Sequence, residues 1–331
     1  MLVHSSAPTR LDLAGGTLDI WPLYLFHRNS QTLNAALSLK AECTVSTSKD
    51  QSWHIESQDT NETIEITELE NSHNAFRNNL VYRVLQHFRP NPVTITTRSD
   101  SPIGAGLAGS SALTVALCAA LSQYTKTGHS PESLMSLAAN LEVQVLGVPT
   151  GVQDYRPAMH GGVSAVEMGP AGITRTGLKV DPKELSQRLI VVYTGQSRNS
   201  GVNNWEITKR HINGDSDIIE LLDEISQVAV AMRVALEAAD WAQVSRQLAH
   251  EWSLRKRLAP TVTTPPIEKL IQHGLAAGAQ AAKICGAGGG GCILFMAEPL
   301  AVPSIRKTLA EKGASVLDTQ VNTDGLQIDV G

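Results

Sequence analysis

The spacing of apolar and polar residues predicts a chain in which groups of strands alternate with groups of helices. Residues 41–48, 52–57 and 63–66 alternate apolar and polar positions, which is typical of short antiparallel strands with one buried face. Residues 1–14 form a further predicted strand, which runs into a Gly-Gly-Thr turn. The remaining predicted strands are 93–98, 161–168, 172–176, 189–194, 281–285, 291–296, 314–319 and 325–330.

Helical periodicity occupies much of the remaining chain. Ser130 followed by Pro131 is a typical helix start, because serine caps the first turn and proline suits its first position. The predicted helices are 73–88, 110–124, 131–146, 216–239, 241–258, 265–278 and 302–312. The pattern restarts near 181–187, and strands precede and follow paired helices without strict βαβ alternation. This order predicts an α+β fold with two sub-domains.

Composition and charge exclude several classes of protein. At 331 residues with 42% hydrophobic content, the chain is long enough to bury one large core or two ordinary ones. The net charge of −5 gives no basic surface for nucleic acid. No segment reaches the roughly 18 continuous apolar residues of a membrane span. Residues 1–6 lack the pattern of a signal peptide. We therefore expect a cytoplasmic protein without nucleic-acid or membrane partners.

The cysteines and histidines show no spacing typical of metal ligands. The four cysteines form no Cys-x-x-Cys pair, so buried, reduced thiols are expected rather than disulfides or a zinc site. His27, His160 and His211 are likewise too far apart along the chain to indicate a metal site.

The stretch from Ser101 to Ala112, Ser-Pro-Ile-Gly-Ala-Gly-Leu-Ala-Gly-Ser-Ser-Ala, is the strongest indication of chemistry. Its glycines let the backbone turn tightly and approach a ligand closely. An apolar helix follows directly, so free N–H groups and the positive end of the helix dipole point to one place, which suits a polyphosphate. The candidate phosphate-binding residues are Gly104, Gly106, Leu107, Ala108, Gly109, Ser110 and Ser111.

Other interpretations of this loop fit less well. Residues 104–109 match the Gly-x-Gly-x-x-Gly of dinucleotide-binding folds, but about 90 residues precede the loop, whereas that motif follows a first strand. A following strand that ends in an acidic residue, which would hold the ribose, is also missing. No Gly-Lys-Ser/Thr closes the loop as in a P-loop. A simple turn without a ligand is the remaining alternative.

Two further clusters flank this loop in the sequence. In the first, Arg10 lies on a predicted strand and Asp19 follows a glycine turn, where its carboxylate can accept hydrogen bonds from hydroxyls; a surface ion pair is the alternative. In the second, residues 286–291 contain five glycines in six positions between two apolar strands. A hairpin turn needs one or two glycines, so the others indicate a close approach of the backbone to another group.

Together and in this order, the three clusters resemble the GHMP kinases, the superfamily of galactokinase, homoserine kinase, mevalonate kinase and phosphomevalonate kinase. Residues 102–112 match the family's Pro-x-Gly-x-Gly-Leu-x-Ser-Ser-Ala with one extra residue before the serines. The resemblance implies an ATP- and Mg²⁺-dependent phosphotransferase in which a homodimer is allowed. It implies an N-terminal ATP-binding and substrate domain (1–185) similar to ribosomal protein S5 domain 2. It also implies a ferredoxin-like C-terminal domain (186–331).

The resemblance also implies roles for particular residues. Ser111 and Glu142 correspond to the Mg²⁺ ligands, and Asp154 corresponds to the carboxylate that faces the acceptor hydroxyl. Arg10 is expected near Asp154, where it either lowers the pKa of that carboxyl or stabilises charge on the phosphoryl group. A solvated helix position for Glu142 and a turn role for Asp154 are the alternatives. The terminal glycine motif is represented by Gly286, Gly288 and Gly289.

The Ala-Gly-Gly turn is most similar to the branch of heptose 7-phosphate kinases and fucokinases, which implies phosphorylation of a sugar or sugar phosphate at its anomeric hydroxyl. The expected substrate contacts are Asp19, Gly16, Thr17 and Arg198. Trp21 is placed to stack on a sugar face. The chain departs from the branch in an inserted Leu18 and in Tyr155, which replaces a glutamine.

Several alternative functions stay open from the sequence. A galactokinase-like or mevalonate/isoprenoid-type kinase is one, although mevalonate kinase carries a lysine where this chain has Arg10. A non-catalytic module that senses ATP and a sugar is another, and a dehydrogenase is the least favoured.

Overall fold

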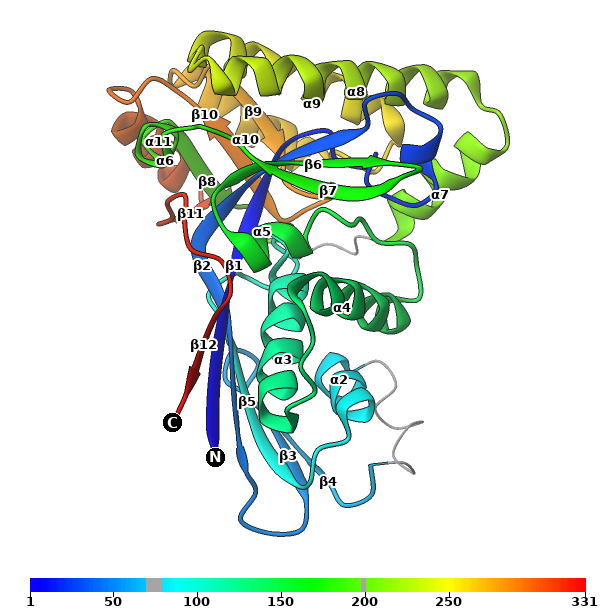
Figure 1. Cartoon of the computed structure of the whole chain (residues 1–331). Coiled ribbons are helices and arrows are strands. Elements are labelled where there is room, and N and C mark those ends of the chain that lie inside the picture. The colour runs from blue at the N-terminus through cyan, green and yellow to red at the C-terminus, as the bar shows by residue number, and fades with distance from the viewer. Residues whose placement is uncertain (70–78, 198–200) are drawn as a thin grey trace.

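The computed structural model describes residues 1–69, 79–197 and 201–331, and its elements form two sheets with helices packed against them (Figure 1). Within the described residues, the larger sheet has eight strands in the order β12-β1-β2-β5-β3-β4, with β6 and β7 added beside β2. Its strands are β1 (Leu2–Ala14), β2 (Gln31–Thr47), β3 (Trp53–Ser57), β4 (Glu62–Ile66), β5 (Val93–Ser99), β6 (Val163–Gly169), β7 (Gly172–Gly177) and β12 (Gln327–Val330).

Helices α2 (Leu80–Phe88), α3 (Gly109–Thr125), α4 (Pro131–Leu146) and α5 (Tyr155–His160) lie together beside this sheet (Figure 1). Helix α3 packs against β1 and β2 and is covered by α2, α4 and α5. Because it is buried on nearly all sides, its sequence is apolar around the whole helix rather than along one stripe. The buried α3 fixes the position of the glycine loop that precedes it.

The smaller sheet is antiparallel, in the order β11-β8-β10-β9. Its strands are β8 (Leu189–Tyr193), β9 (Ala281–Ile284), β10 (Cys292–Met296) and β11 (Ser315–Leu317), and α10 (Pro265–Ala276) and α11 (Val302–Glu311) pack beside them. The long helices α8 (Ser216–Glu237) and α9 (Trp241–Leu258) form a pair that also contacts β1 (Figure 1). The short elements are η1 (Leu23–Leu25), α6 (Pro182–Ser186) and α7 (Gly201–Ile212).

The predicted α+β class is confirmed, and most predicted elements appear within a few residues of their expected bounds. Helix α4 begins at Pro131 as predicted, with the Ser130 side chain accepting a hydrogen bond from the Ser133 N–H at 3.2 Å. Helix α2 begins at Leu80, and the first part of the helix predicted at 73–88 lies outside the described residues. The four cysteines are buried.

Several parts of the described structure were not predicted, among them η1. Residues 31–40 extend β2 toward the N-terminus; they escaped detection because residues 31–37 are all buried and lack alternation. Helix α5 is too short for a periodic pattern, and α7 shows none that the sequence analysis detected.

The predicted boundary after residue 185 falls inside α6, and β12 of the predicted C-terminal segment pairs with β1; the division itself stays a prediction.

In the described part of the chain, no helix is both long and apolar enough to cross a membrane.

The glycine loop before β10 interlocks with the glycine loop before α3. The Cys292 N–H donates to the Ala105 carbonyl at 2.7 Å, across 187 residues of sequence (292 − 105). Gly291 lies beside this contact with φ of +85°, and a Cβ there would stand 2.6 Å from the Ala105 carbonyl oxygen. The close contact therefore requires glycine at 291 and joins the two sheets at the pocket described below.

We predict that Gly291→Ala lowers the free energy of unfolding more than Gly313→Ala does. Gly313 has nearly the same φ, +86°, but a Cβ added there would meet nothing within 4 Å. The control variant therefore carries only the left-handed strain of about 1–2 kcal/mol, whereas alanine at 291 must also displace backbone. Urea unfolding measures both, and equal losses in the two variants would contradict the interlock.

Candidate active site

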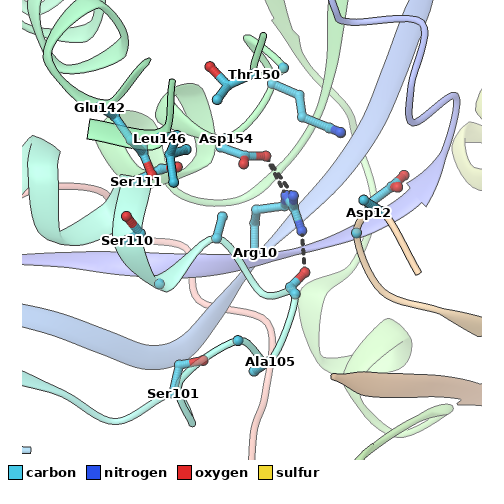
Figure 2. A pocket seen from close by; sticks show the side chains of 18 of the residues that line it. Arg10, Asp12, Ser101, Ala105, Ser110, Ser111, Glu142, Leu146, Thr150 and Asp154 are labelled. Atoms are coloured by element: carbon cyan, nitrogen blue, oxygen red, sulfur yellow. Dashed lines mark hydrogen bonds and ion pairs between the residues drawn. The ribbon is translucent and has the colours of Figure 1, made fainter. Parts of the chain in front are cut away.

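The three glycine-rich segments meet at one cavity of about 320 Å³, within the range typical of small-molecule sites (Figure 2). β1 and the turn after it supply one wall, and the loop before α3 supplies another. The end of α4, the segment before α5 and the loop after β9 also line it. Segments from both sheets therefore build the same site.

The loop from Gly104 to Ser111 presents the N-terminus of α3 to the cavity. Gly106 and Ala108 have positive φ, +80° and +59°, so the chain turns sharply into the helix at Gly109. Ala108 caps α3 without a side-chain hydrogen bond, which leaves N–H groups of the first turn available to a ligand. Such a terminus favours an anion. All the candidate phosphate-binding residues line the cavity except Leu107, which is fully buried in the core beneath the loop.

Arg10 and Asp154 form the central ion pair of the site (Figure 2). The Arg10 Nε and Nη2 atoms donate to Asp154 Oδ1 at 2.9 and 2.6 Å, and Nη1 donates to the Gly106 carbonyl at 2.9 Å. Burial alone would lower the pKa of Arg10, but the carboxylates of Asp154 and Asp12 outweigh it and raise that pKa. Arg10 therefore stays charged and ties β1, the phosphate loop and Asp154 together.

Glu142 is a buried carboxylate at the cavity beside Ser111 (Figure 2). Burial raises its pKa, while hydrogen bonds from Ser110, Tyr155 and Ser111 act in the opposite direction. The Tyr155 hydroxyl donates to Glu142 Oε2 at 2.7 Å. Among the described residues, no cationic side chain forms an ion pair with Glu142. A buried carboxylate beside two hydroxyls and a phosphate loop is a donor set that fits Mg²⁺, which binds one or two protein oxygens together with phosphates.

No histidine of the described residues lines this cavity. His27 and His211 approach through their Nε2 atoms at 3.0 Å, and His27 Nδ1 lies 2.7 Å from Asp223 Oδ1. Within residues 1–69, 79–197 and 201–331, no group of three or more His, Cys, Asp or Glu side chains is arranged to hold a metal ion.

Asp19 lies buried at the cavity on the turn after β1. Its Oδ2 accepts a hydrogen bond from the Gln153 N–H at 3.2 Å, and the Gly151 backbone passes directly against the carboxylate. Burial, together with the nearby charge of Asp154, raises the pKa of Asp19 to about 7. Thr17 lines the cavity with Asp19, so two of the expected substrate contacts face the same space.

The other residues expected at the substrate do not line the cavity where the structure describes them. Gly16 packs against the side chains of Asp12 and Arg255 and is not part of the cavity lining. Trp21 is 65% exposed and does not line the cavity either. Arg198 lies outside the described residues.

The terminal glycine motif divides between the cavity and the core. Gly286 lines the cavity, and its carbonyl accepts a hydrogen bond from Arg255 Nη2 at 2.7 Å. Gly288 and Gly289 instead turn against Val262, where the Gly289 N–H donates to the Val262 carbonyl at 2.8 Å. Of these three glycines, only Gly286 lines the cavity.

A buried cluster of four charges, two of which (Asp12 and Arg255) line the cavity, was not predicted. Arg255 Nη1 lies 3.3 Å from Asp12 Oδ2, and Lys283 Nζ lies 3.4 Å from Asp12 Oδ1 and 3.0 Å from Glu251 Oε1. Burial would raise the pKa of Asp12, but Lys283 and Arg255 hold it below its usual value. Asp12 was detectable, because it lies two residues after Arg10 and so on the same face of the strand. Arg255 and Glu251, on a distant helix, carried no such signal.

Further side chains, apolar and polar, line the cavity although they were not predicted as site residues. The apolar ones include Leu80, Leu113 and Leu146, and the polar ones include Asp59, Gln153 and Asn204.

Comparison with known proteins identifies relatives of this arrangement. Residues 79–162 match the family profile of the GHMP kinases N terminal domain, and residues 232–315 match that of the GHMP kinases C terminal domain. The chain is 28% identical to the D-glycero-alpha-D-manno-heptose 7-phosphate kinase of Campylobacter jejuni over 98% of both chains. It is 27% identical to the mevalonate kinase of Pyrococcus furiosus over 72% of this chain and 69% of that protein.

Solved structures show the same fold. A D-glycero-D-manno-heptose 1-phosphate kinase from Bacteriodes thetaiotaomicron superposes with a TM-score of 0.78 at 26% identity, covering 99% of both chains. The Lactococcus lactis galactokinase complexed with galactose gives the same TM-score at 16% identity, covering 98% of this chain and 95% of that one.

We predict that Asp19→Asn gains stability relative to the parent as the pH rises. The folded-state pKa of Asp19, about 7, lies above its ordinary value of 3.8. The contribution of this carboxyl to folding stability is therefore fully present below pH 4 and is lost as the pH rises through 7. The difference in free energy of unfolding between the variant and the parent should shift by about 1–3 kcal/mol in favour of the variant from pH 5 to pH 8. Thermal or urea unfolding at both values measures it.

The control is Asp318→Asn, because the Asp318 side chain is fully exposed. This variant should follow the parent at both pH values. An unchanged difference for Asp19→Asn between pH 5 and pH 8 would show that its carboxyl is not protonated in the folded protein near neutrality.

Proposed function

The chain belongs to the GHMP kinase superfamily, and on that premise we propose that it transfers the γ-phosphoryl group of ATP to a hydroxyl, the anomeric one, of a sugar or sugar phosphate such as a heptose 7-phosphate. One observation carries the proposal. Arg10 binds both the phosphate loop, through the Gly106 carbonyl, and the Asp154 carboxylate in a single cavity. A phosphate-binding helix terminus and a carboxylate for the acceptor are thus held side by side.

The donor half of the cavity suits a nucleoside triphosphate. The α3 terminus and its loop receive the phosphates, and the apolar side chains of Leu80, Leu113 and Leu146 offer a surface for the base. When bound, Mg²⁺ neutralises charge on the phosphates, and Ser111 and Glu142 are the residues that hold it.

Asp154 and Arg10 act on the acceptor. Asp154 orients the acceptor hydroxyl and takes its proton as the new bond to the γ-phosphorus forms and the bond to the ADP oxygen breaks. Arg10 holds Asp154 in place through two hydrogen bonds and supplies positive charge beside the transferring group. These roles need only small movements, since the ion pair already borders the cavity.

A polyhydroxylated acceptor suits the remaining wall. Asp19, Thr17 and Gln153 offer acceptors and donors to several hydroxyls. The match to a heptose 7-phosphate kinase extends over 98% of both chains, whereas the mevalonate kinase match covers 72% of this chain. This difference favours a sugar acceptor over an isoprenoid alcohol. The combination of Ser111, Glu142 and Asp154 favours catalysis over sensing, since a sensor needs no acceptor carboxylate.

We predict that Asp154→Asn lowers kcat by about 10²–10⁴-fold, because the amide cannot take the hydroxyl proton. Nucleotide affinity should change little, since the phosphate loop remains. A coupled ADP-release assay with heptose 7-phosphate, fucose, galactose and mevalonate, together with calorimetric titration of a nonhydrolysable ATP analogue, measures both quantities.

Asp318→Asn, which alters an exposed carboxylate outside the cavity lining, is the matched control and should keep parental kcat. Full turnover in the Asp154 variant would remove the role assigned to that carboxylate. A preference for mevalonate in the parent enzyme would remove the assignment of a sugar.

A further inference from the structure

We propose that Tyr155 is a positioning residue for the metal site. Its hydroxyl fixes the Glu142 carboxylate and holds it at a constant position relative to Asp154. The inference rests on the proposed function, in which Glu142 holds Mg²⁺ and Asp154 faces the acceptor.

The Tyr155 ring is anchored in the core. Tyr155 is 1% exposed and belongs to the same apolar cluster as the buried residues of α3. Helix α5, which Tyr155 begins, packs against β1, α3 and α4. The ring is therefore held by well-packed neighbours, and only its hydroxyl reaches the polar site.

That hydroxyl donates to Glu142 Oε2 at 2.7 Å, a short hydrogen bond between two buried side chains. A glutamate has three rotatable side-chain bonds, and its terminal carboxylate rotates readily. The hydrogen bond to a fixed phenol restricts this freedom, together with the hydrogen bonds from Ser110 and Ser111. Glu142 and Ser111 then present their oxygens side by side at the cavity, from α4 and α3 (Figure 2).

Tyr155 also connects two carboxylates that act on different substrates. Asp154 occupies the N-cap position of α5 and Tyr155 is the first residue of that helix. Glu142, on α4, is thereby attached to the backbone unit that carries Asp154. Asp154 is bound in turn by Arg10 from β1. The metal carboxylate and the acceptor carboxylate thus keep a fixed separation, which transfer in line requires.

The test is Tyr155→Phe, which removes the hydroxyl and keeps the ring. We measure Mn²⁺ affinity in the presence of a nonhydrolysable ATP analogue by electron paramagnetic resonance. The affinity should fall about 10-fold, as expected for loss of a group that orients a ligand. Analogue binding without metal should stay within about twofold of the parent, and the apparent KM for Mg²⁺ should rise while kcat at saturating Mg²⁺ largely recovers.

Tyr82→Phe is the matched control. Tyr82 is also fully buried, and its hydroxyl donates to the Leu69 carbonyl at the same 2.7 Å, but it does not line the cavity. A comparable loss of stability without a change in Mn²⁺ affinity is expected for this variant. If Tyr155→Phe proves too unstable for titration, the rise in melting temperature on adding Mn²⁺ with the analogue gives the same comparison, and it should be smaller than in Tyr82→Phe.

Glu142→Gln separates the inference from the proposed function. If this variant binds Mn²⁺ as the parent does, the metal assignment of Glu142 is wrong and the role of Tyr155 falls with it. If Glu142→Gln loses Mn²⁺ affinity but the Mn²⁺ affinity of Tyr155→Phe stays within twofold of the parent, only the positioning role is overturned. In the double variant the tyrosine change should have no further effect, and an undiminished effect there would also overturn the proposal.

Discussion

The site depends on a buried guanidinium. Arg10 is 3% exposed, and a charge at that depth is tolerated only when it is paired and its N–H groups are hydrogen-bonded. Three of its N–H groups go to the Asp154 carboxylate and the Gly106 carbonyl, which come from chain segments about 50 residues apart. The cost of leaving Arg10 unpaired therefore restrains the geometry: the glycine loop before α3 and Asp154 cannot separate without leaving this charge exposed or unpaired.

The second buried charge cluster extends the same restraint to the other half of the chain. Asp12 is two residues from Arg10 on β1, and it pairs with Arg255 on α9 and Lys283 on β9. Arg255 in turn binds the carbonyl of Gly286. Such clusters contribute little net stability, because the desolvation of each ion offsets much of its attraction. Their effect is on position, since they hold the two sheets and the terminal glycine loop in one arrangement around the cavity.

The sequence was sufficient wherever the information was local. The start of α4 was correctly predicted from Ser130 and Pro131, and the glycine loop before α3 was correctly predicted to open a buried helix. The first part of β2 was not predicted, because its burial on both faces removes the alternation of apolar and polar residues that identifies a strand. The superfamily was predicted because three motifs occur in order, and the sugar-kinase branch was predicted from the Ala-Gly-Gly turn.

Contacts between segments far apart in the sequence could not be predicted from it. Nothing near Glu251 or Arg255 indicates a partner in β1, and the five glycines at 286–291 look equivalent although only the first of those singled out reaches the cavity. Tyr155 was noticed only as a departure from its relatives, and its contact with Glu142 became visible once α4 and α5 were packed together. The roles assigned to the individual site residues stay predictions.

The hydrogen bond from Cys292 to Ala105 has a consequence for biosynthesis. A ribosome that has released the first half of the chain has produced the phosphate loop but not the strand that supports it. The nascent polypeptide therefore lacks the completed cavity until translation has passed β10. Because the loop before α3 gains this support so late, a copy truncated before β10 lacks the contact that holds the loop in the full chain.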